Sequence, residues 1–171
     1  MGILVCGLNG SGKSTLGRAL AAALRLRFLD SEDLYFPDGR FDAPRTREEF
    51  LAALDAATRE GDFVFASVKG NGVQALHERI SLAIWVDAPR ETRLQRVRER
   101  SFRRFGERML PGGDLYAAEE RFFAQVASRS DEEMRAWAAQ LPWPVLRVDG
   151  TRPVQALVPE VCTWISETTG L

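Results

Sequence analysis

The sequence predicts an α/β fold in which helices cover both faces of a five-stranded parallel sheet. Three observations lead to this prediction. Strand-like and helix-like segments alternate along the chain, residues 2–6 form a continuous apolar run, and no hairpin turn joins any two strands. A continuous apolar run is typical of a strand buried on both faces, and parallel strands need crossover connections.

The expected elements follow in order along the chain. We expect strands at 2–6, 26–30, 62–68, 81–87 and 144–149. We expect helices at 13–25, 46–61, 71–79, 90–103, 115–128, 130–141 and 153–168. Thr46 and Glu49 form a capping box at the start of the second of these helices. Residues 31–45 and 103–114 are rich in glycine, proline or aspartate and predict irregular structure.

Composition indicates one compact domain over residues 1–171. Of the 171 residues, 45% are hydrophobic and 27% are charged, which is ordinary for a globular chain. No apolar run reaches the roughly 20 residues of a membrane span, so no membrane partner is expected. Residues 2–6 are expected to be a strand rather than part of a signal peptide, and the two cysteines show no disulfide or zinc spacing. We therefore expect a cytoplasmic protein.

A phosphate-binding loop follows the first strand. Gly7 to Ser14 match the motif G-x-x-x-x-G-K-[ST] in full, with a strand before and a helix after. Backbone N–H groups and the helix N-terminus would hold the phosphates of ATP. Lys13 would reach the β- and γ-phosphates, and the Ser14 hydroxyl would bind Mg²⁺. The expected nucleotide-binding residues here are Gly7, Asn9, Gly10, Ser11, Gly12, Lys13, Ser14 and Thr15.

The loop alone leaves the reaction open, because ATPases, GTPases and kinases all use it. The guanine-reading motif N-K-x-D is absent, and the third strand carries no carboxylate of the kind that large ATPases need. The chain has two lysines, Lys13 and Lys69, beside 21 arginines. The narrow lysine amine fits a tight phosphate-binding loop that is too small for a planar guanidinium. The use of lysine at position 13 in a chain that otherwise prefers arginine therefore supports the role of Lys13.

Three acids end the second strand, where the topology brings them near the loop. Asp30 is expected to hold a magnesium-bound water, together with the Ser14 ligand. Asp33 is expected to orient an acceptor hydroxyl or take its proton. The alternative is that Asp30, Glu32 and Asp33 cap the following turn and stay solvated.

Arginines concentrate after the fourth strand. Residues 90–108 contain eight arginines and three glutamates. Arg93, Arg96 and Arg100 are spaced to share one helix face, where they could stabilise charge on a transferring phosphate. The alternative is a solvated face paired with glutamates. Residues 103–115 are expected to form a lid that delivers an arginine such as Arg108.

Four segments together resemble the P-loop kinases of the adenylate, shikimate and gluconate kinase group. They read GLNGSGKST, FLDSEDLYFP, VDAPRETRLQRVRER and VDGTRP, and the resemblance covers nearly the whole chain. Residues 103–116 also resemble small bacterial proteins labelled AAA-type or adenylate-kinase-like. The resemblance implies a three-layer P-loop NTPase fold with strand order 2-3-1-4-5, a short arginine-rich lid and an acceptor-binding region at about 31–60.

The resemblance also implies roles for individual residues. By similarity Arg96 would stack on adenine, Arg100 would contact phosphate, and Gly150 and Pro153 would lie in the loop that cradles adenine. Arg121 or Arg129 would be a transfer-site arginine. The segment ASVKGNG replaces the D-G-F-P-R of adenylate kinases, and the tandem glycines of shikimate kinases are absent, so neither specificity is carried over. The candidates for acceptor binding are Asp30, Asp33, Arg40, Arg45, Lys69, Arg108 and Arg129.

The sequence therefore predicts an ATP- and Mg²⁺-dependent phosphotransferase that acts on a small-molecule acceptor, such as a nucleotide or a sugar acid, as a monomer or homodimer. Lys13, Asp33 and Arg100 are the expected catalytic residues. One alternative is a nucleotide-binding regulatory ATPase without a small acceptor. Another is a nucleic-acid end kinase that grips the backbone through 90–108, which the net charge of −1 disfavours.

Overall fold

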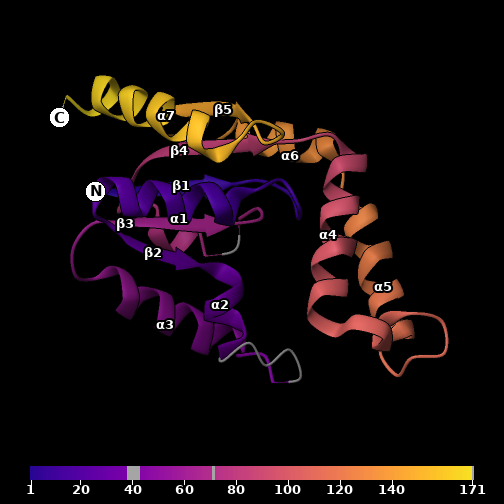
Figure 1. Cartoon of the computed structure of the whole chain (residues 1–171). Coiled ribbons are helices and arrows are strands. Elements are labelled where there is room, and N and C mark those ends of the chain that lie inside the picture. The colour runs from indigo at the N-terminus through magenta and orange to yellow at the C-terminus, as the bar shows by residue number, and fades with distance from the viewer. Residues whose placement is uncertain (38–42, 71, 171) are drawn as a thin grey trace.

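The computed structural model describes residues 1–37, 43–70 and 72–170 and contains one parallel sheet with strand order β2-β3-β1-β4-β5. This order confirms the predicted fold (Figure 1). Every paired strand is parallel, so all carboxyl ends meet at one edge. The strands are β1 (Gly2–Cys6), β2 (Arg27–Asp30), β3 (Phe63–Ser67), β4 (Ile80–Asp87) and β5 (Val145–Asp149).

Helices connect the strands on both faces of the sheet. The α-helices are α1 (Lys13–Leu24), α2 (Ser31–Tyr35), α3 (Arg47–Thr58), α4 (Arg90–Phe105), α5 (Tyr116–Ala127), α6 (Asp131–Ala138) and α7 (Val154–Thr169). Two 3₁₀ turns are η2 (Gln74–Leu76) and η3 (Gly106–Met109). The Thr46–Glu49 capping box is present at the start of α3 with both of its hydrogen bonds.

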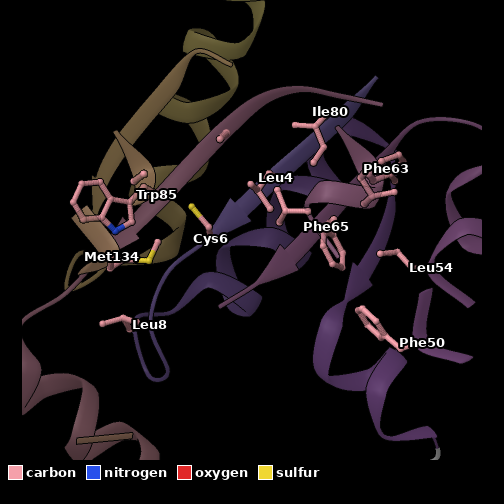
Figure 2. Packing of buried hydrophobic residues seen from close by; sticks show 14 residues of the cluster. Leu4, Cys6, Leu8, Phe50, Leu54, Phe63, Phe65, Ile80, Trp85 and Met134 are labelled. Atoms are coloured by element: carbon pink, nitrogen blue, oxygen red, sulfur yellow. The ribbon is translucent and has the colours of Figure 1, made fainter. Parts of the chain in front are cut away.

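Each face of the sheet has its own apolar core. One core joins strand residues such as Phe65 and Trp85 to Phe50 of α3 and Met134 of α6 (Figure 2). The other joins alternate strand residues to α1 and α7, for example Leu20 and Val161. Because successive side chains on a strand point to opposite faces, the near-continuous apolar strands supply both cores at once.

Helices α4 and α5 stand beside the sheet and run next to each other, away from it (Figure 1). A third, smaller apolar cluster lies within this unit, built from Val97, Met109, Phe123 and Val126. None of these four residues belongs to the two sheet cores. Within the described residues, no helix combines the length and apolar character that a membrane crossing needs.

Three local predictions were wrong. Residues 31–35, expected as loop, form α2, because the Asp30 side chain accepts a hydrogen bond from the Glu32 amide and caps a helix. In the predicted helix at 71–79, the described part contains only the short 3₁₀ turn η2. The irregular segment expected from residue 103 begins later, because α4 continues to Phe105, and η3 then follows.

Candidate active site

The loop between β1 and α1 lies at the carboxyl edge of the sheet. The Ser11 amide donates a hydrogen bond to Leu8 O over 3.1 Å, and the Leu16 amide donates to Gly12 O over 2.9 Å, which begins α1. Within the described residues, Oδ1 of Asn9 and Oγ of Ser11 are buried and have no hydrogen-bond partner. Buried polar atoms normally find partners, so these two atoms favour a polar ligand at the loop.

Gly10 lets the loop pass directly over the first turn of α4. Its φ is +80°, and a Cβ on it would lie 2.2 Å from the carbonyl oxygen of Arg93. Gly150, in the loop after β5, is equally confined, because a Cβ there would lie 2.2 Å from Ser11 O. The phosphate loop is thus packed against both α4 and the β5–α7 loop, and only glycine allows either contact.

Lys13 is the first residue of α1 and is only 7% exposed. Burial lowers the pKa of its ammonium, the acids Asp30 and Glu32 oppose that effect, and the positive charges of Arg100 and Arg129 add to it. Because the pKa of Lys13 is lowered overall, the nearby negative charges do not fully offset the cost of burying its ammonium. An anion bound at the loop would supply the missing charge, so the site fits phosphates.

The acids after β2 occupy different environments. Asp30 is buried and caps α2. Asp33 is exposed and lies 3.6 Å from the Arg18 guanidinium. Burial and the negative charge of Asp30 raise the pKa of Asp33, and Arg18 opposes that shift. Asp30 therefore has the capping role weighed as an alternative, but its charge also acts on Lys13.

Arg96 connects the phosphate loop to the loop after β5. Its Nη1 donates to Gly150 O over 2.9 Å and lies 3.4 Å from both Gly10 O and Ser11 O. A cavity of about 280 Å³ opens beside these contacts. Its lining combines backbone at the phosphate loop with apolar side chains, among them Ser11, Gly12, Thr15, Val86, Val154 and Leu157. An apolar cavity with a few fixed polar groups is suited to a planar base. Pro153, another predicted adenine contact, is the N-cap residue of α7.

The arginines of α4 do not share one role. Arg93, expected on the same face as Arg96 and Arg100, is only 1% exposed and donates to Ala88 O and to Asp131. That part of the prediction was wrong, because helical spacing cannot reveal a carboxylate 38 residues further along the chain. Arg100 is exposed, and its charge acts on Lys13. Sequence reasoning missed Asp131 and the pairing of Arg93 with it, and the burial of Arg93 is the feature of the structure that marks this pair.

The predicted acceptor residues are mostly engaged in contacts within the protein. Lys69 lies 3.5 Å from a Glu133 carboxylate oxygen, and Arg45 donates to Leu34 O over 2.7 Å. Arg108 forms a 2.6 Å ion pair with Asp114 on the exposed segment that follows α4. Arg40 lies outside the described residues.

Arg129 differs from these residues. Its side chain is half-buried, burial lowers its pKa, and within the described residues it has no carboxylate partner. Its charge acts on Lys13. Among the predicted acceptor-binding cations that the structure describes, Arg129 is the one whose charge lowers the pKa of Lys13.

The residues fit a magnesium ion that is held chiefly by phosphates. Within the described residues, no group of three or more histidine, cysteine, aspartate or glutamate side chains could hold a metal. Mg²⁺ commonly uses one or two protein ligands, substrate phosphates and waters rather than an all-protein cage. The Ser14 hydroxyl and the Asp30 carboxylate are the groups available for that arrangement.

A phosphate loop after the first strand of a 2-3-1-4-5 parallel sheet defines a P-loop nucleotide-binding protein. The family model described as "AAA domain" matches residues 3–107. The chain is 30% identical to "Uncharacterized protein YqaC" of Bacillus subtilis, over 96% of this chain and 97% of that protein. It is 34% identical to a shikimate kinase of Symbiobacterium thermophilum, over 74% of this chain and 83% of that enzyme.

The structure of shikimate kinase from Aquifex aeolicus superposes with a TM-score of 0.60 at 18% identity, over 99% of this chain and 98% of that chain. This likeness concerns the fold. The chain belongs to the AAA domain family and, within the P-loop proteins, to the small-molecule kinases of the shikimate kinase type. The resemblance deduced from the four sequence segments is thereby confirmed.

Proposed function

We propose that this kinase moves the γ-phosphate of ATP, with Mg²⁺, to a hydroxyl group of a small-molecule acceptor. The observation that carries the proposal is the set of charges around Lys13. The acids Asp30 and Glu32 act on its ammonium from the β2 side, and Arg100 and Arg129 act on it from α4 and from the α5–α6 joint. Phosphoryl transfer relies on such positioning and charge neutralisation rather than on covalent chemistry by the protein.

In this proposal each group has one task. The loop amides and Lys13 hold the β- and γ-phosphates, and Arg100 and Arg129 neutralise charge that develops on the transferring group. Asp33 orients the acceptor hydroxyl or takes its proton, and its raised pKa makes it a better base than an ordinary surface carboxylate. Arg96 and the Gly150–Pro153 loop hold the adenine beside the apolar cavity.

Ser14 and Asp30 would hold the magnesium ion, which when bound neutralises phosphate charge and fixes the geometry of the phosphate chain. Asp30 can do so while it caps α2, because a carboxylate has two oxygens and the Glu32 amide uses Oδ1.

The acceptor is a small hydroxyl compound bound between Asp33, Arg129 and the lid. The relative from Symbiobacterium thermophilum is named for shikimate, which makes shikimate one compound to test. Gluconate, nucleosides and nucleoside monophosphates are the others, since the tandem glycines of shikimate kinases are absent here. A cytoplasmic location and a monomeric or homodimeric state complete the proposal.

The test is a transfer assay on the purified chain with ATP, MgCl₂ and each acceptor, followed by ³¹P NMR of the products. We expect a new phosphate ester with at least one acceptor and none with Lys13→Ala. Arg59→Ala, which removes an exposed intrahelical ion pair with Asp55, is the matched control and should keep full activity.

Three outcomes would count against the proposal. Full activity of Lys13→Ala would overturn the role of the loop. ATP binding without transfer to any acceptor would favour the regulatory ATPase instead. Transfer to the 5′ end of an oligonucleotide, with binding that weakens steeply as salt rises, would favour the nucleic-acid end kinase.

A further inference from the structure

Two arginines in the first turn of α4 hold the joint between α5 and α6. Nη2 of Arg90 donates to the carbonyl oxygen of Ala127 over 2.6 Å, and Nη2 of Arg93 donates to Oδ1 of Asp131 over 2.5 Å. Ala127 is the last residue of α5 and Asp131 is the first residue of α6. The three residues between them, 128–130, are therefore fastened at both ends.

Arg129 is the middle residue of this fastened joint. Its half-buried guanidinium has no carboxylate partner within the described residues, whereas Arg93 and Arg108 are both paired. The charge of Arg129 acts on Lys13 of the phosphate loop. Arg129 is a partly desolvated cation in a joint that Arg93 ties to the phosphate loop, so it is available to an anion bound at that loop.

Arg93 has a buried, hydrogen-bonded side chain, and its backbone contacts the phosphate loop. The Arg93 side chain is 1% exposed, and its Nε donates to Ala88 O over 3.0 Å. Its carbonyl oxygen lies where a Cβ on Gly10 would have to go. One residue therefore contacts the loop through its backbone and the α5–α6 joint through its side chain.

The two partners of this ion pair differ in exposure, because the Arg93 side chain is 2% exposed and the Asp131 side chain is 44% exposed. Arg93 therefore loses nearly all of its hydration, whereas Asp131 keeps part of its own. Nη1 of Arg93 is also buried without a hydrogen-bond partner in the described part of the chain.

We propose that Asp131, held by Arg93, is a positioning residue that keeps Arg129 against the phosphates bound at Lys13. This inference rests on the proposed function, in which Arg129 neutralises charge on the transferring phosphate. Arg90 acts in the same way at the other end of the joint, through Ala127.

A double-mutant cycle with Arg129→Ala, Asp131→Asn and the double variant tests the inference. Calorimetry gives the Kd of each protein for ADP and for AMP-PNP, which carries the third phosphate. We expect Arg129→Ala to weaken AMP-PNP binding about tenfold with little change for ADP, because a charged hydrogen bond is worth about that much. Asp131→Asn should weaken AMP-PNP binding severalfold, and the double variant should be no weaker than Arg129→Ala alone.

Glu132→Gln is the matched control, because residue 132 also lies in the first turn of α6 and is exposed. It removes the same charge near the same helix end and should leave the AMP-PNP to ADP ratio unchanged. Arg90→Ala protects the test against misfolding, because its exposed side chain can be lost without opening a core. Like Asp131→Asn, Arg90→Ala should weaken the binding of AMP-PNP.

The inference would be overturned if the fold-changes in the Kd for AMP-PNP of the two single variants multiplied in the double variant. It would also be overturned if Asp131→Asn left the ratio of the Kd values for AMP-PNP and ADP unchanged. The proposed function fails separately. A non-additive cycle without transfer to any acceptor would keep the positioning role and reject the kinase mechanism. If the wild type transfers phosphate and the cycle is additive, the kinase mechanism is kept and the positioning role of Asp131 is rejected. If the wild type binds no AMP-PNP, the kinase mechanism and the positioning role are both rejected.

Discussion

The guanidinium of Arg96 donates a hydrogen bond to the carbonyl oxygen of Gly150 over 2.9 Å. This contact joins α4 to the loop after β5, directly beside the phosphate loop. A residue expected to stack on adenine thus also holds the backbone that lines the base cavity. Both functions would be lost together if Arg96 were shortened.

Replacing Arg96 by alanine should weaken nucleotide binding. We expect the Kd for AMP-PNP to rise about tenfold, which corresponds to about 1.4 kcal/mol, because a charged hydrogen bond and a cavity wall disappear. Calorimetric titration measures the change. Arg147→Ala, which removes an exposed ion pair with Asp87, serves as the control, and an equal loss in both variants would contradict the role of Arg96.

Replacing Gly10 by alanine should destabilise the protein by about 2 kcal/mol or more. The new Cβ would meet Arg93 O at 2.2 Å while the backbone keeps a φ of +80°. Gly112→Ala is matched to it, since its φ is +92° but no atom lies within 4 Å of the added Cβ. It should cost about 1 kcal/mol, and urea unfolding would measure both. Equal costs would show that the loop moves freely away from α4.

Replacing Lys13 by methionine should stabilise the nucleotide-free protein while it removes nucleotide binding. Burial lowers the pKa of Lys13, so the charged ammonium opposes folding at neutral pH. We expect the melting temperature without ligand to rise by roughly 2–4 °C for each kcal/mol gained. The upward shift that ATP gives the wild type should vanish in the variant.

The same substitution has a defined pH dependence. Between the lowered pKa of Lys13 in the folded protein and its ordinary value of 10.5, the unfolded chain binds more protons than the folded one. The free energy of unfolding of the wild type should therefore rise with pH in that window, relative to Lys13→Met. Unfolding titrations from pH 7 to 10 would test this, and a difference that widens with pH would contradict it.

Replacing Arg18 by alanine should move the acid limb of the pH profile to higher pH. Arg18 opposes the burial and the Asp30 charge that raise the pKa of Asp33, so its removal lets that pKa rise further. Because a base must be deprotonated to act, the midpoint of kcat/KM should shift upward by about half a pH unit or less. Arg27→Ala, whose guanidinium contacts Glu60 O, should leave the midpoint in place.

The strands of the sheet were predictable from short-range patterns, whereas their order was predicted from the resemblance to P-loop kinases. Each of these patterns is a short continuous segment of the sequence: the apolar runs of the strands, the Gly7–Ser14 loop and the Thr46–Glu49 capping box. The part of the site that depends on the loop was therefore placed correctly at the carboxyl edge of the sheet.

The remainder depends on contacts between distant residues. Arg93 has helical spacing with Arg96 and Arg100, and no local signal shows that it pairs with Asp131 instead. Asp30 likewise serves as a helix cap because residues 31–35 are helical, which a stretch rich in Asp, Gly and Pro did not suggest. A pattern gives the spacing of charges along a helix, but the partner of each charge is decided by packing.

The third apolar cluster has a mechanical consequence. Because Val97, Met109, Phe123 and Val126 pack among themselves, α4 and α5 form one packed unit beside the sheet. Helix α4 has 16 residues and is therefore about 24 Å long, and the phosphate loop touches its first two turns. A tilt of about 10° at that end would carry the far end, beside the predicted lid at 103–115, through about 4 Å.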